Sequence, residues 1–139
     1  MNIRSVYARL ALALIAEEKK DSARKVIDRC LNDMPDNTLP FDYFVVGLAE
    51  GLFKLGDTEK AKVIAEKLIN SSVEKLAYYF SFPDEDLRDM DMPMREALYT
   101  LQKIGVSAKE ANQVKLAAMA EQNMNKYYEL YVNKVYRPE

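Results

Sequence analysis

The sequence predicts an all-α fold, a stack of antiparallel helical hairpins, and three observations predict it. Apolar residues recur at the 3.6-residue helical period, and no segment shows the strict alternation of a strand. The 139 residues include only 4 glycines and 5 prolines, so few positions interrupt a helix. Two stretches also repeat one spacing of large and small residues, Tyr7, Leu10, Ala11 and Leu14 in the first and Val45, Leu48, Ala49 and Leu52 in the second.

The first hairpin is expected over residues 3–35. Its helices cover residues 3–18 and 21–34, with Asp21 as the N-cap of the second helix and Pro35 as its stop signal. Ala23 is predicted to be a tight contact between the helices. Cys30, the one cysteine of the chain, is interpreted as a small buried hydrophobic residue and not as a reactive thiol. A linker over residues 37–42 follows.

The second hairpin is expected over residues 42–70. Its first helix covers residues 42–55 and ends at Gly56, because a positive φ costs a glycine little. Its second helix begins at Thr58 and places Ala61 where the first hairpin has its own buried alanine. Residues 73–80 either continue this helix or form a short helix of their own, which ends before Pro83.

A third, drifted hairpin is expected over residues 93–133. Its first helix covers residues 93–104 and ends at Gly105, and a capping box over residues 107–110 begins the last helix. Glu110 stands where the small alanine of the repeat should be. We interpret the long last helix as the cap of the stack, because a terminal unit must present a polar outer face. All 139 residues then form one domain.

Several function classes are excluded by what the chain lacks. It has no histidine, which is the commonest general base and metal ligand, so we expect no enzyme and no cofactor. The net charge is −2 with interleaved signs, so a nucleic-acid footprint is not expected. Arg9 interrupts the N-terminal apolar stretch, and no apolar run reaches about 18 residues. A signal peptide and a membrane span are therefore not predicted, and we expect a soluble chain.

One acidic cluster supports an alternative. Carboxylates at this density can hold Ca²⁺, although Arg95 stands where an EF-hand has its bidentate glutamate. An acidic segment ahead of a helix is also stabilised by the helix dipole, which is the simpler interpretation. The alternative function is a small carboxylate-based metal-dependent or catalytic domain that uses Asp84, Glu85, Asp86, Asp89 and Asp91.

The hairpin spacing resembles the tetratricopeptide family. The resemblance implies a right-handed superhelix of helix pairs, a role in protein–protein recognition, and a concave groove lined by the first helix of each pair. Since Ala8 and Leu12 replace the Lys and Asn with which that family clamps a peptide carboxylate, the mostly apolar groove instead suits an amphipathic helix. The implied groove residues are Ala8, Leu12, Ile15, Tyr43, Val46, Glu50, Phe53, Arg95 and Tyr99.

A narrower resemblance is to the soluble C-terminal helical domain of a Bacteroidetes-type multi-pass membrane family that is similar to protein O-mannosyltransferases. It implies a membrane-embedded parent that holds any glycosyl-transfer chemistry, and a periplasmic location for this chain. An independent cytoplasmic repeat protein is the competing hypothesis. The resemblance rests on Ala8 to Ile15, Asp21 to Ala23, Arg29 to Leu31 with Met34 and Pro35, Asp42 to Phe44, Gly56 and Asp57 with Glu59 to Ala61, and Tyr78 to Ser81.

The first helix is apolar on nearly all sides, which is typical of a helix in an interior. We therefore expect it to be covered by a parent chain, by a second copy in a homodimer, or by the last helix folded back. Leu12 or Ile15 is predicted to lie at such an interface or in an apolar groove that a partner fills.

Overall fold

The computed structural model describes residues 2–36 and 41–136, so residues 37–40 of the expected linker lie outside the described part. Within these ranges all regular elements are helical, and the predicted all-α fold is confirmed. In chain order the elements are α1 (Ile3–Ala16), α2 (Lys20–Asp33), the 3-10 helix η1 (Tyr43–Val45), α3 (Val46–Leu55), α4 (Thr58–Tyr79), the 3-10 helix η2 (Asp84–Met90), α5 (Asp91–Glu110) and α6 (Val114–Lys134).

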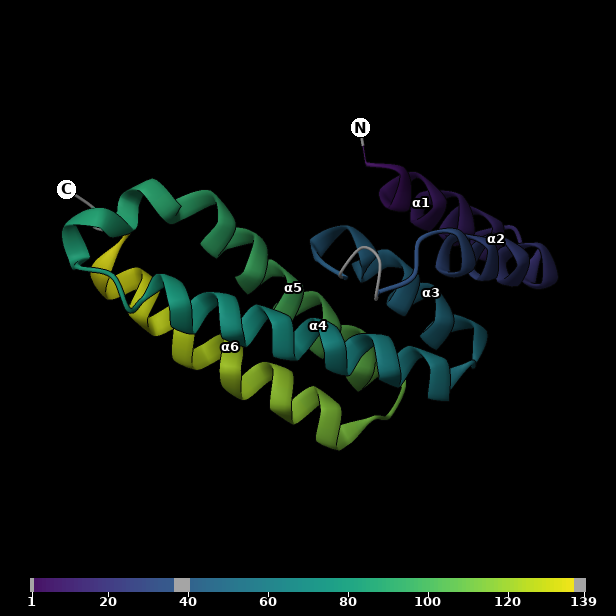
Figure 1. Ribbon diagram of the computed structural model, residues 1–139. Coiled ribbons are helices and arrows are strands. Elements are labelled where there is room, and N and C mark those ends of the chain that lie inside the picture. The colour runs from purple at the N-terminus through teal and green to yellow at the C-terminus, as the bar shows by residue number, and fades with distance from the viewer. Residues whose placement is uncertain (1, 37–40, 137–139) are drawn as a thin grey trace.

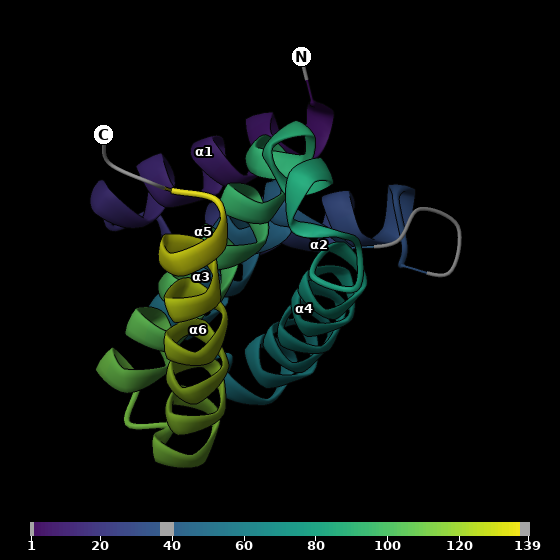
Figure 2. The same cartoon turned by 90° about the vertical axis from the view of Figure 1, so that its left-hand side faces the viewer.

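The helices pack as three successive hairpins, α1 with α2, α3 with α4 and α5 with α6. The first helices of the pairs also contact one another, because α1 packs on α3 and α3 on α5. Figure 1 shows α4, α5 and α6 running alongside one another, with the α1–α2 hairpin beside α3 at the upper right. In Figure 2, α1 lies across the top of the molecule and α4 and α6 extend below it. The arrangement is compatible with a helical repeat.

The first helix of every hairpin ends in the same turn. Glu18, Gly56 and Asn112 have positive φ values of 61°, 82° and 61°. The residue after each donates its backbone N–H to a carbonyl five positions back, at 2.8 Å for Lys19, 2.9 Å for Asp57 and 2.8 Å for Gln113. This is the Schellman geometry, in which a left-handed residue closes the helix and satisfies its last carbonyls. The second helix then begins two residues after the left-handed residue in all three units.

The expected position of the turn between the two helices of the third hairpin is wrong. Gly105 lies inside α5, which continues to Glu110, and Ser107 is buried within that helix and does not begin the next one. The Schellman turn at Asn112 ends α5, so no capping box is needed at residue 107. Gly105 serves packing, because a Cβ atom there would lie 3.5 Å from the Cβ of Ala120 on α6.

The third unit has drifted less than its sequence indicates. When the units are aligned on their left-handed residues, Ala117 takes the place of Ala23 and Ala61, and all three alanines are buried. The predicted burial of Ala23 and Ala61 is thus confirmed. Gly105 takes the place of Ala49 in the second unit, so both small positions of the repeat are small in the third unit also.

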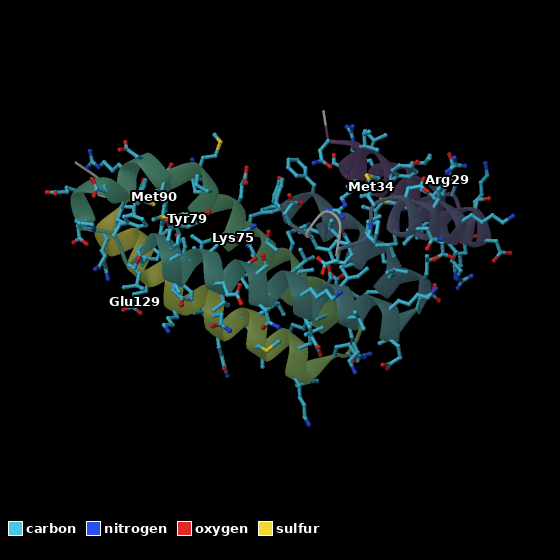
Figure 3. All side chains as sticks on the ribbon, viewed as in Figure 1. Arg29, Met34, Lys75, Tyr79, Met90 and Glu129 are labelled. Carbon is cyan, nitrogen blue, oxygen red and sulfur yellow. The ribbon has the colours of Figure 1, made fainter. Side chains whose placement is uncertain are left out.

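The end of α4 resolves an alternative that the sequence left open. α4 runs without a break from Thr58 to Tyr79, so residues 73–79 continue the helix. The acidic segment after it forms the 3-10 helix η2. Figure 3 labels Tyr79 and Met90 at this end of the molecule, far from Met34 at the end of α2, and both side chains pack against the core.

A buried arginine joins the first hairpin to the second. Arg4 of α1 is 2% exposed, donates a 2.7 Å hydrogen bond to the carbonyl of Met34, and lies 5.1 Å from the ring centroid of Phe41. The backbone N–H of Phe41 donates to Asp36 at 2.8 Å, and Lys67 of α4 approaches the same carboxylate at 3.3 Å. The Phe41 N–H, assisted by Lys67, lowers the pKa of Asp36 below its ordinary value. These contacts hold the two ends of the linker.

Candidate functional site

A hollow of about 330 Å³ opens between the three first helices. Its wall on one side is α1, its floor is η1 with the start of α3, and its other wall is α5. Six of the nine groove residues implied by the sequence line it, namely Ala8, Leu12, Tyr43, Val46, Glu50 and Tyr99. The structure therefore brings together side chains from three helices that are far apart in the chain.

The other three implied groove residues lie elsewhere. Ile15 is half-buried between α1 and α3, where its Cδ1 atom would lie 3.5 Å from a Cβ on Gly51. Phe53 is buried and borders a smaller hollow of about 80 Å³ that it shares with Glu50. Arg95 lines a separate hollow between α5 and α6.

The floor of the hollow is shallow because α1 and α3 approach closely. A Cβ atom on Gly47 would lie only 2.8 Å from the Cβ of Ala8. Aromatic rings form the side toward α5, where the centroid of Tyr43 lies 5.3 Å from that of Tyr99 and 5.2 Å from that of Phe44. Glycine and alanine thus let the helix backbones meet, and Tyr43, Phe44 and Tyr99 contribute aromatic rings to the lining of the hollow.

The hollow is more polar than the sequence indicated. Arg9 and Lys103 line it from opposite walls, and neither was among the implied groove residues. Lys103 Nζ lies 6.0 Å from the ring centroid of Tyr99, while the carboxylate of Glu50 is 3.5 Å from Lys54 Nζ. The signal for Lys103 is present in the sequence, because it follows Tyr99 by one helical turn and so shares its face.

The face of α1 that remains uncovered differs in part from the expected one. Leu12 and Ile15 are both half-buried by the second hairpin. The most exposed large apolar side chains of α1 are instead Ile3 at 60%, Leu10 at 49% and Val6 at 36%. Since Leu12 lines the hollow, its predicted contact with a partner stays a prediction.

The acidic segment does not gather its carboxylates. Asp84 accepts from Lys134 Nζ at 3.3 Å, and Asp91 accepts from the Tyr131 hydroxyl at 2.5 Å and lies 3.7 Å from Arg95. Burial, together with the Asp91 carboxylate, raises the pKa of Tyr131 to about 12. Within residues 2–36 and 41–136, no three His, Cys, Asp or Glu side chains lie close enough together to hold a metal ion.

Cys30 of α2 is fully buried, and this burial raises the pKa of its thiol. A buried, protonated thiol is a poor nucleophile, which agrees with its interpretation as a packing residue.

Comparisons with known protein families, curated protein sequences and solved structures find no match to this chain. Among the helices that the structure describes, none is both long and apolar enough to cross a membrane.

Proposed function

We propose that this chain is a non-catalytic protein-interaction module that binds a partner segment in the hollow between α1, α3 and α5. The observation that carries the proposal is the convergence of six sequence-implied groove residues on that one hollow. Its tyrosines and leucine offer apolar contact area, and Arg9 and Lys103 offer positive charge at the rim. An amphipathic helix with one apolar face and acidic flanks fits this combination.

The setting that we propose is the soluble accessory domain of a larger bacterial membrane protein with a glycosyltransferase-like core. Only the sequence resemblance supports this setting, which would place the chain on the periplasmic face of the inner membrane. The competing proposal is an independent cytoplasmic adaptor. Sequencing the gene upstream of the codon for Met1 distinguishes them, because an upstream reading frame that encodes a run of hydrophobic spans supports the first and an in-frame stop codon directly upstream supports the second.

The binding proposal is tested with two leucines of the same helix. Among the peptides selected from a phage-displayed random library against the folded chain, one class is expected to lose binding to Leu12→Glu, since Leu12 lines the hollow. They are expected to keep binding to Leu10→Glu, since Leu10 is exposed and lies outside it. A selection in which every peptide keeps its binding to Leu12→Glu, or a selection that yields no peptide, contradicts the proposal.

A further inference from the structure

A second hollow surface runs along the last hairpin. Two adjoining hollows of about 570 Å³ and 230 Å³ lie between α5 and α6 and share Gln102 and Met124 as lining residues. We call them together the α5–α6 trough. Its lining on α5 extends from Arg95 to Lys109, a distance of roughly 20 Å at the rise of an α-helix. The trough therefore has the length of about four helical turns.

The repeat shows what occupies the same place in the preceding unit. In the second hairpin, Leu68 and Ser72 of α4 are 1% and 5% exposed. They share a small hollow with Ala97 and Thr100 of α5, so α5 is the helix that covers them. The ring of Tyr43 on the same hairpin also meets α5, through its contact with Tyr99.

The residues of the third hairpin that correspond to Leu68 and Ser72 are not covered by another helix. With the units aligned on Gly56 and Asn112, Leu68 and Ser72 correspond to Met124 and Tyr128 of α6. Both line the trough, and Tyr128 is 52% exposed where its counterpart is buried. Tyr99, the counterpart of Tyr43, also lines it. The last hairpin thus presents the surface on which the preceding hairpins each seat another helix.

We propose that the α5–α6 trough binds one amphipathic α-helix of a partner protein, seated on α5 and α6 as α5 is seated on α3 and α4. This site adjoins the hollow between α1, α3 and α5, because Tyr99 lines both, but its other lining residues are different and the inference does not rest on the function proposed for that hollow. The bound helix continues the row of first helices and runs parallel to α5. Its N-terminus then lies near Arg95. The guanidinium of Arg95 is 3.7 Å from the carboxylate of Asp91.

Charge and size define the partner helix further. An Asp or Glu in its first turn pairs with Arg95 and is also favoured by the helix dipole. Its apolar residues recur at intervals of three and four positions, because they must follow one face over about four turns. Tyr99, Tyr128 and Tyr136 present ring faces and hydroxyl groups, which suit a helix that carries both apolar and polar contacts.

The test uses a phage-displayed library of peptides of about 16 residues on a helix-forming template, roughly four and a half turns long. The selected peptides that keep their binding to Leu12→Glu are expected to show the three-and-four apolar spacing with an acidic first turn. Fluorescein-labelled copies are then titrated with the full chain by fluorescence anisotropy. Tyr128→Glu is expected to weaken binding about tenfold or more, as truncation of a central tyrosine anchor does.

Two control variants make the result specific. Tyr78→Glu changes a tyrosine of similar exposure on α4, at 61% against 52% for Tyr128, and Leu12→Glu changes the other hollow, so both are expected to leave the affinity of these peptides unchanged. Circular dichroism is the control that checks whether Tyr128→Glu is folded. The inference is overturned if no selected peptide keeps its binding to Leu12→Glu, if the peptides that keep it lack the helical spacing, or if their affinity is insensitive to Tyr128→Glu. None of these results bears on the peptides selected for the first hollow.

Discussion

Replacing Gly47 with alanine is expected to destabilise the chain by forcing α1 away from α3. The new Cβ atom would start 2.8 Å from the Cβ of Ala8. Two carbon atoms make favourable contact at about 3.5–4.0 Å, so the helices must separate locally by about 0.7–1.2 Å. Overpacking of this kind costs about 1–3 kcal/mol, and the better helix propensity of alanine returns at most about 1 kcal/mol.

Gly105→Ala is the matched control for this substitution. Its Cβ atom would lie 3.5 Å from the Cβ of Ala120, which is an ordinary contact, so the gain in helix propensity should dominate. We expect Gly105→Ala to stabilise the chain by about 0.5–1 kcal/mol and Gly47→Ala to destabilise it by about 0.5–2 kcal/mol. For a chain of this size, about 1 kcal/mol corresponds to roughly 3–5 °C in Tm.

The assay is urea denaturation followed by circular dichroism, with the double variant Gly47→Ala, Ala8→Gly included. Removing the Ala8 methyl group relieves the close approach, so the double variant should be more stable than the sum of the two single changes indicates. Equal stability of Gly47→Ala and Gly105→Ala, or strict additivity in the cycle, would refute the reasoning.

Four further predictions follow from the same contacts. Ala23→Leu and Ala61→Leu should each lower the free energy of unfolding by about 1–3 kcal/mol, because both alanines are fully buried; unchanged urea midpoints would contradict their packing role. Glu18→Gly should raise the free energy of unfolding by about 1 kcal/mol, because φ at this position is 61°, a value that strains a residue with a Cβ atom; a lower Tm for the variant would argue against this backbone strain. Asp36→Asn should destabilise the chain at neutral pH, because the lowered pKa of Asp36 in the folded state stabilises the fold fully above the ordinary value of 3.8. This difference should shrink as the pH falls below 3.8 and disappear below the lowered pKa; urea midpoints of parent and variant at neutral and at acidic pH test this, and a constant difference is the contrary result. The pKa of Tyr131 is raised from 10.0 to about 12, so the protonated hydroxyl stabilises the fold fully below pH 10.0 and this contribution is lost as the pH rises toward 12. The difference in the free energy of unfolding between the parent and Tyr131→Phe should therefore narrow from pH 10.0 to 12. In an absorbance titration, the variant should lack one tyrosine that ionises late in the parent.

Much of the fold could be predicted from the sequence because local rules determine it. The apolar period and Gly56 define the first two hairpins, and Ala23 and Ala61 are small where two helices must meet. The sequence places the turn of the third hairpin wrongly, because Gly105 resembles a helix end, although a glycine also occurs where two helices pack closely. Asn112 was the missed signal, since asparagine also adopts a positive φ at a helix end.

The groove could be predicted in part, because the repeat spacing is also a local pattern. Repeat spacing places Leu12, Tyr43 and Tyr99 on the first helices, and the structure brings them to one hollow. The spacing does not place Arg9 or Lys103 there, because the side chains that close a hollow depend on how far each helix is rotated and tilted against its neighbour.

By itself, the sequence determined the helical content, the first two hairpins and the residue sizes at their interfaces, because helix periodicity and turn chemistry act over a few neighbouring residues. Only the tertiary structure decided which helix ends are equivalent, which faces the hairpins cover and which remain open. Tyr128 has the same local pattern whether or not a helix lies on it. Its exposure depends on whether a further helix covers it. α5 covers Ser72, the corresponding residue one unit earlier, but in the described part of the chain no helix follows α6 to cover Tyr128.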